Sequence, residues 1–169
     1  AGRTLGIARW EPWDEPDITD AGESDLAAFS PAEYAQFFLV VSSALRAVVP
    51  SLQVGGPSVS NAAALPSYLG ALLDAGGTPD YIAFHAYEVD RDESDEAGFQ
   101  SAEALGPAVE AARAMLDVPV VVGEINADGE AEPRNRDAYS LAFLPVADLA
   151  LVRVAADSVV RWEALEEDF

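Results

Sequence analysis

The chain has 169 residues, of which 50% are hydrophobic, so it is long enough and apolar enough to fold around a core of its own. It carries 30 acidic residues against nine basic ones, all of them Arg, and its net charge is −21. This charge argues against binding to nucleic acid or to an anionic membrane, because phosphate groups are bound by cationic surfaces.

The acidic surface together with the absence of Lys is typical of a halophilic protein. The Debye length shrinks to ~3 Å at 1 M salt, so concentrated salt screens the repulsion between carboxylates while they keep the surface hydrated. An acidic face that binds a protein partner is the alternative explanation.

The chain contains no Cys and one His, His85. A disulfide, a thiol nucleophile, a thiolate metal site and a histidine-rich metal site are therefore excluded. We expect neither a metal nor a cofactor, and we expect acid–base chemistry to depend mainly on carboxylates.

The first predicted strand covers residues 5–10 and ends in a turn-rich stretch, residues 11–16. A helix follows, because Ser30 is a good N-cap, Pro31 suits the first helical position and Glu33 completes a capping box. Apolar residues recur at helical spacing from Tyr34 onward, and Pro50 ends the helix.

The remaining segments continue the alternation of strand and helix. A second strand, residues 52–57, precedes a helix over residues 65–75. A third strand, residues 80–87, is followed by an acidic stretch, residues 88–97, that is typical of a solvated loop. The last four predicted segments are a helix over 101–116, a strand over 118–124, a helix over 134–150 and a strand over 158–162.

Apolar strands separated by helices of this length favour an α/β fold with a parallel sheet, formed as a single domain. Parallel-sheet enzymes place their chemistry at the C-terminal ends of the strands. The residues at these ends are Trp13, Asp14, Glu15, residues 56–58, His85, Tyr87, Glu124, Asn126 and Trp162.

Four of these strand ends carry motifs in a recognisable order. Residues 10–16, Trp-Glu-Pro-Trp-Asp-Glu-Pro, resemble the Trp-Asn-Glu-Pro motif at the fourth strand of the retaining (β/α)8 glycoside hydrolases. Residues 54–57, 84–87 and 122–124 resemble the ends of the fifth, sixth and seventh strands. The chain is most similar to the β-xylosidases and α-L-iduronidases, glycoside hydrolase family thirty-nine.

The resemblance implies a partial (β/α)8 barrel whose five strands match the fourth to the eighth. The missing strands would precede Ala1, so we expect the chain to be the C-terminal part of a longer barrel, with the missing half supplied by the full-length protein. Alone, it is expected to leave strand edges and apolar surface open and to be impaired in activity. The first residues show no signal-peptide core, and the sequence does not decide whether the protein is cytoplasmic or secreted.

The resemblance also assigns roles to individual residues. Glu15 would be the general acid/base and Glu124 the nucleophile of a retaining cleavage, which needs two carboxyl groups ~5–5.5 Å apart. His85 and Tyr87 would contact substrate and orient the nucleophile, and Trp162 would stack on a sugar face. Trp13, Asp14 and Asn126 are the remaining substrate-binding candidates.

Asp14 departs from the family, which has Asn before the acid/base. An ionised Asp accepts hydrogen bonds but cannot donate one to a sugar hydroxyl. Two alternatives therefore stay open beside the hydrolase. One is a catalytically impaired, carbohydrate-binding barrel relative. The other is an unrelated acidic α/β domain, which could bind divalent cations through residues 90–96 or 126–130.

Overall fold

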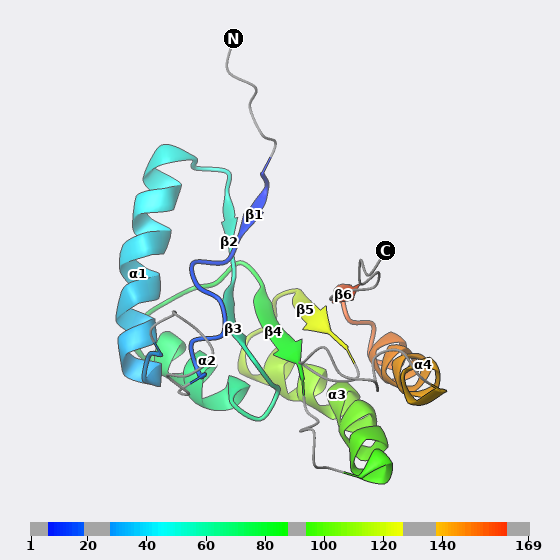
Figure 1. The fold of residues 1–169 in the computed structure, drawn as a ribbon. Coiled ribbons are helices and arrows are strands. Elements are labelled where there is room, and N and C mark those ends of the chain that lie inside the picture. The colour runs from blue at the N-terminus through cyan, green and yellow to red at the C-terminus, as the bar shows by residue number, and fades with distance from the viewer. Residues whose placement is uncertain (1–6, 19–27, 88–93, 127–137, 162–169) are drawn as a thin grey trace, which may run out of the picture.

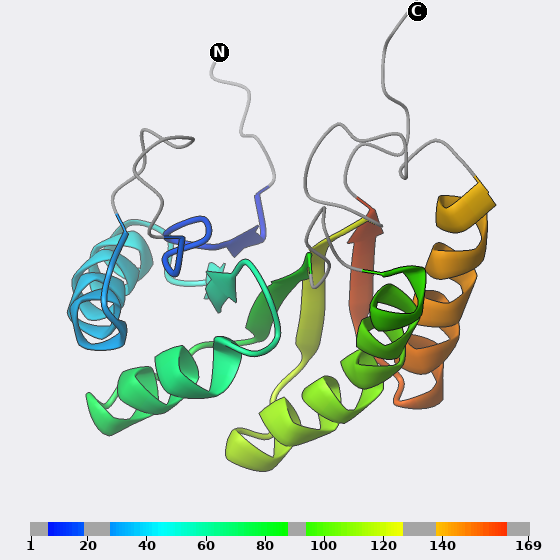
Figure 2. The ribbon, with the colours of Figure 1, turned by 60° about the horizontal axis from the view of Figure 1, so that its bottom comes forward.

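The computed structural model describes residues 7–18, 28–87, 94–126 and 138–161. Along these residues short parallel strands alternate with helices, and the four helices lie around one side of the strands (Figure 1, Figure 2). The strands are β1 (Arg9–Trp10), β2 (Gln53–Val54), β3 (Gly56–Val59), β4 (Ile82–Ala86), β5 (Val120–Ile125) and β6 (Ser158–Arg161). The helices are α1 (Pro31–Val48), α2 (Leu65–Asp74), α3 (Asp95–Met115) and α4 (Ala138–Arg153).

All strand pairs among the described residues are parallel, as the sequence predicts. Strand β1 pairs with β2, and a four-stranded sheet has the order β3-β4-β5-β6. Each neighbouring pair in the larger sheet is joined through a helix, which is the βαβ arrangement expected from the alternation. The chain thus has the α/β fold of a partial barrel.

The second predicted strand forms two strands rather than one. Gly55 separates β2, which pairs with β1, from β3, which pairs with β4. A side chain at Gly55 would collide with the Tyr81 ring, and one at Gly56 would collide with the Tyr34 hydroxyl. Gly56 also has φ +151°, a conformation that side chains disfavour, so these glycines permit the chain to change partners.

Helix α1 forms as predicted. The Ser30 hydroxyl accepts the Glu33 N–H, and Glu33 accepts the Ser30 backbone N–H over 2.9 Å, which completes the capping box. Tyr34 and Phe38 are fully buried from this helix, and the apolar residues of β3, β4 and β5 complete the core.

The prediction of a loop over residues 88–97 is wrong at its end, because α3 begins at Asp95. The Ser94 hydroxyl caps the helix by accepting the Ala97 N–H, and two acidic residues in the first turn favour the positive helix N-terminus. No helix among the described residues is long and apolar enough to cross a membrane.

Two acidic side chains each connect one strand to another at the ends opposite the predicted site. Asp80, just before β4, accepts the Val54 N–H over 2.8 Å and pairs with Arg46 at 2.6 Å. Asp157, just before β6, accepts the Val120 N–H over 2.8 Å and pairs with Arg113 at 2.9 Å.

Candidate active site

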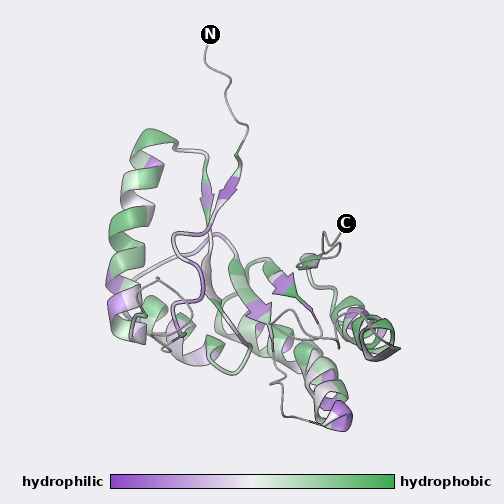
Figure 3. Ribbon diagram, viewed as in Figure 1, coloured by the Kyte–Doolittle hydropathy of each residue, from purple (hydrophilic) through white to green (hydrophobic). Residues whose placement is uncertain are grey.

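Strands β4 and β5 bring His85 and Glu124 together. They are direct partners in the parallel pairing, although the register shifts between Phe84 and His85. Both strands are mostly buried and apolar, and hydrophilic colour is visible at their arrowheads (Figure 3). The polar side chains therefore stand at the C-terminal end of an apolar sheet, where the sequence predicts them.

The loop after β1 brings Asp14 and Glu15 to the same place. The Glu15 backbone N–H donates to the Ser58 carbonyl of β3 over 2.9 Å. Glu15 and Ser58 both have a left-handed backbone conformation, with φ 43° and φ 57° respectively. Such conformations cost ~1–3 kcal/mol each and tend to occur at functional sites, because the surrounding structure must maintain them.

Asp17 fixes the other side of this loop. Its carboxylate accepts the backbone N–H and the hydroxyl of Ser60, each over 2.8 Å. The Tyr68 hydroxyl adds hydrogen bonds to the carbonyls of Pro16 and Phe29. The loop that carries Glu15 is thus attached to the end of β3 and to α2.

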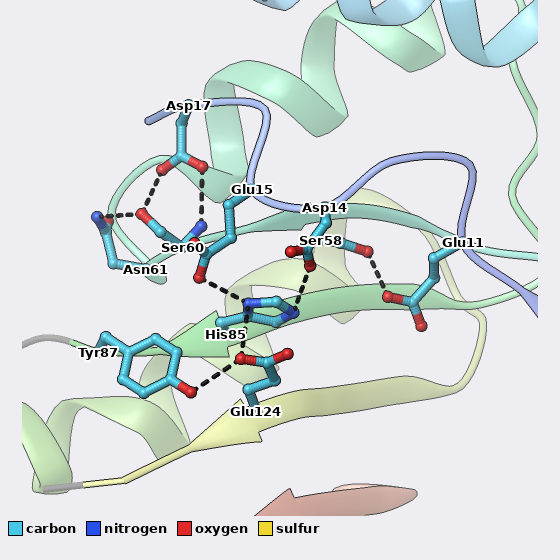
Figure 4. A network of polar contacts seen from close by, with 10 residues as sticks. All are labelled: Glu11, Asp14, Glu15, Asp17, Ser58, Ser60, Asn61, His85, Tyr87 and Glu124. Atoms are coloured by element: carbon cyan, nitrogen blue, oxygen red, sulfur yellow. Dashed lines mark hydrogen bonds and ion pairs between the residues drawn. The ribbon is translucent and has the colours of Figure 1, made fainter. Parts of the chain in front are cut away.

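His85 lies at the centre of three carboxylates (Figure 4). Its Nδ1 is 2.9 Å from Glu15 Oε1 and 3.7 Å from Glu124 Oε2, and its Nε2 is 3.8 Å from Asp14 Oδ1. Because a carboxylate only accepts, Nδ1 carries the proton of the short contact with Glu15. Glu15 Oε1 and Glu124 Oε2 both lie near Nδ1, so these two carboxylate oxygens are close to each other.

The group is buried on the histidine side and open on the Asp14 side. The exposed fraction of the side chain is 3% for His85, 19% for Glu15, 22% for Glu124 and 62% for Asp14. Solvent or a ligand would therefore reach the carboxylates past Asp14.

The surroundings change the proton affinity of His85. Burial acts to lower its pKa, but the hydrogen bond with Glu15 and the charges of Glu124, Glu15 and Asp14 outweigh it and raise the pKa above its ordinary value. The imidazole thus favours the protonated form more than a solvated histidine does.

Burial raises the pKa of Glu124 above its ordinary value. The His85 charge and the Tyr87 hydroxyl, which donates to Oε2 over 2.8 Å, oppose this rise, while Asp14 and Glu15 add to it. Partial burial also raises the pKa of Asp14; His85 lowers it, and Glu15 and Glu11 raise it. Negative charge is therefore crowded at this end of the sheet.

Sequence reasoning missed Glu11 and Tyr81 beside this group, whereas it placed Ser58 at a strand end without giving it a role. Glu11 accepts the Ser58 hydroxyl at 2.5 Å through Oε2 and the Tyr81 hydroxyl at 3.2 Å through Oε1. The position of Glu11, directly after β1, could have identified it as a strand-end carboxylate. Tyr81 carries no comparable signal, because it belongs to a stretch that is otherwise buried.

The other predicted residues are placed as follows. The ring of Trp13 packs edge-on against Phe29 and Phe37, with centroids 5.1 and 5.4 Å away. Asn126 directly follows β5 and is buried, with 7% exposure. Trp162 lies outside the described residues. Sugar binding by these three residues stays a prediction.

Comparison with protein families shows to which family the chain belongs. The profile described as "Glycosyl hydrolases family 39" matches residues 6–158. The chain belongs to glycosyl hydrolases family 39. The interpretation as an unrelated acidic α/β domain is therefore wrong; its two proposed cation-binding stretches lie mainly outside the described residues.

Solved structures agree with this family. The chain is similar to a monomeric β-xylosidase from Caulobacter crescentus CB15, with 26% identity and a TM-score of 0.64 over 90% of this chain and 32% of that one. A family 39 enzyme from Xanthomonas axonopodis pv. citri is 20% identical, with a TM-score of 0.63 over 90% of this chain and 32% of that one. Its likeness supports the fold.

The fold is also shared with an endo-β-1,3-glucanase of family 128 from Sorangium cellulosum. That structure is 21% identical, with a TM-score of 0.61, and the match covers 97% of this chain and 62% of that one. None of the curated proteins compared with the chain matches it. The chain spans about a third of the length of the family 39 structures that it matches.

Proposed function

We propose that this chain provides the two catalytic carboxylates of a retaining glycoside hydrolase that acts on a xyloside-like sugar. The observation that carries the proposal is the contact of one buried imidazole with both Glu15 and Glu124. Membership of family 39 and the likeness to a β-xylosidase support the substrate class.

In the proposed reaction, Glu124 attacks the anomeric carbon while Glu15 protonates the leaving glycosidic oxygen. The bond to the leaving group breaks as the ester bond between Glu124 and the sugar forms. Glu15 then removes a proton from water, which attacks the anomeric carbon and releases the sugar and the Glu124 carboxylate.

The remaining polar residues orient this pair. Tyr87 donates to Glu124 Oε2 and leaves the other carboxylate oxygen available for attack. His85 holds Glu15 through Nδ1, and its positive charge would stabilise two neighbouring carboxylates while both are ionised. Trp13 supports the loop through its packing against Phe29 and Phe37.

A second candidate is a carbohydrate-binding relative that has lost turnover. Asp14 favours it, because an additional carboxylate stands where the family has an amide donor. This candidate predicts that the chain binds xylosides and leaves them intact.

The experiment is covalent trapping in the full-length protein, which supplies the rest of the barrel, with a 2-deoxy-2-fluoroxyloside that has an activated leaving group. The fluorine slows hydrolysis of the glycosyl ester, so intact-protein mass spectrometry should show one added sugar, and peptide mapping should place it on Glu124. Glu124→Gln should take up none, whereas Glu103→Gln, on the exposed face of α3, should label like the wild type. Xyloside binding with neither label nor turnover would establish the second candidate, and turnover without a label would contradict the proposed mechanism.

A further inference from the structure

We propose that Asp14, His85 and Glu124 form a binding site for a divalent transition-metal ion such as Zn²⁺. One potential ligand atom from each of the three residues lies within 4.8 Å of the other two. The set contains one imidazole nitrogen and two carboxylates, which is a donor set that Zn²⁺ uses in proteins, with an open position for a further ligand.

The hydrogen bonding of His85 is what points to a cation. Nδ1 donates its proton to Glu15 Oε1, so Nε2 is the ring nitrogen that can bind an ion, which would displace the Nε2 proton of the imidazolium. The nearest recorded group within the described part of the chain is Asp14 Oδ1 at 3.8 Å, too far for a hydrogen bond. Nε2 of the buried His85 side chain thus faces a carboxylate oxygen at a distance that an ion bound to both atoms could span.

Glu15 completes an arrangement that is common around metal-binding histidines. The second ring N–H of such a histidine is almost always donated to a carboxylate or a carbonyl, which fixes the tautomer and the ring orientation. The 2.9 Å contact between His85 Nδ1 and Glu15 Oε1 provides this hydrogen bond before any ion binds.

The balance of charge favours a cation at the same place. Among the described residues, the recorded ion pairs of Asp14, Glu15 and Glu124 all go to His85, and Glu11 adds a further carboxylate beside them. A single imidazolium cannot neutralise this group. A bound divalent ion would compensate the remaining negative charge.

Gly123 leaves space beside Nε2. A Cβ at this position would lie 3.3 Å from His85 Nε2 and 3.9 Å from Glu11 Oε2, so a larger residue would crowd the nitrogen edge. Zinc bonds of ~2.0–2.2 Å let two ligand atoms lie up to ~4.4 Å apart. A small rotation of the exposed Asp14 side chain would bring the three ligand atoms into range.

The ion would regulate the site of the proposed function. It would occupy an oxygen of Glu124 and the open side of the cluster near Asp14, so zinc and sugar would exclude each other. Only this consequence rests on the proposed function; the binding of the ion does not require turnover.

The test is isothermal titration calorimetry of the chelator-treated chain with ZnCl₂, in millimolar MgCl₂ to occupy weak sites on the acidic surface. We expect one saturable zinc site in the wild type. Asp14→Asn should weaken it by at least ~10-fold, since a ligand is lost. Glu11→Gln is the matched control: it removes one negative charge from the same cluster but no ligand, and it should retain most of the affinity.

Equal loss in Asp14→Asn and Glu11→Gln would show attraction by charge alone and would overturn the site. A wild type without a saturable zinc site, or with the same zinc affinity as Asp14→Asn, would also overturn it. Circular dichroism of each variant separates these outcomes from misfolding. The trapping experiment fails or succeeds independently, because calorimetry detects the ion without any sugar.

Discussion

The Tyr87 hydroxyl donates a hydrogen bond to Glu124 Oε2 over 2.8 Å, which joins side chains from the ends of two adjacent strands. Removing it by Tyr87→Phe should lower kcat about 10- to 100-fold with little change in KM, because a hydrogen bond to a charged group contributes ~1.5–3 kcal/mol. Steady-state kinetics on an aryl xyloside checks this. Tyr81→Phe, which removes a hydroxyl that contacts Glu11, is the matched control and should retain more of kcat.

The roles of Glu15 and Glu124 can be separated by azide rescue. In Glu124→Gly, azide would attack the anomeric carbon directly and give a glycosyl azide of inverted configuration. In Glu15→Gly with an activated substrate, Glu124 would still form the ester, and azide would then give the retained configuration. Nuclear magnetic resonance identifies the anomer of each product. Retention in Glu124→Gly and inversion in Glu15→Gly would mean that Glu15 is the nucleophile and Glu124 the acid/base.

Asp17 should matter for activity although it touches none of the three central carboxylates. Asp17→Asn weakens the bonds to the Ser60 N–H and hydroxyl, which fix the loop that carries Glu15. We expect ~1–3 kcal/mol less stability and a fall in kcat beyond that of an equally destabilised core variant such as Val109→Ala. Urea unfolding gives the stability of each variant, and steady-state kinetics on the same samples gives its kcat. Equal kcat in Asp17→Asn and Val109→Ala would contradict a positioning role for Asp17.

The fold itself was predictable where periodicity and capping agree, as in α1, whose cap residues Ser30 and Glu33 can be read from the sequence. The division at Gly55 was not, because a change of strand partner depends on contacts with Tyr81 and Tyr34, distant in sequence. The candidate carboxylates could be identified by their position after apolar strands. The family resemblance implies that His85 lies near Glu124, but the hydrogen bond of His85 with Glu15 could not be predicted, since it depends on a register shift and on left-handed backbone at Ser58.

Acid should destabilise the fold through Asp80 and Asp157. Burial acts to raise the pKa of Asp80, but the Val54 N–H and Arg46 hold that pKa below its ordinary value. The Val120 N–H and Arg113 likewise lower the pKa of Asp157. A lowered folded-state pKa means that the stabilisation is present above the unfolded pKa of ~3.9 and is lost as pH falls through the folded value.

The measurement is the free energy of urea unfolding of Asp80→Asn and Asp157→Asn across pH. Each variant should be less stable than the wild type at pH 7, and the difference should shrink below about pH 4. Glu110→Gln, on the exposed face of α3, should show little difference at any pH. A difference in unfolding free energy that stays constant down to pH 2 would contradict a stabilising role for the ionised Asp80 and Asp157 carboxylates.

The net charge of −21 leads to a prediction about salt. Molar NaCl or KCl should raise the midpoint of thermal unfolding, because a Debye length of ~3 Å screens repulsion between surface carboxylates. Scanning calorimetry at low and molar salt checks this. Stability that is unchanged or lower in molar salt would contradict a halophilic protein.

The hydrogen bond from the Glu15 N–H to the Ser58 carbonyl means that Glu15 is held by β3 rather than by its own strand, β1. His85 and Glu124 stand on β4 and β5, so the proposed catalytic groups share one platform of three contiguous strands. The spacing of the two carboxylates thereby depends on the backbone of β3 at Ser58. Its left-handed φ of 57° is a conformation that β-branched and bulky residues rarely adopt, so these residues are disfavoured at position 58.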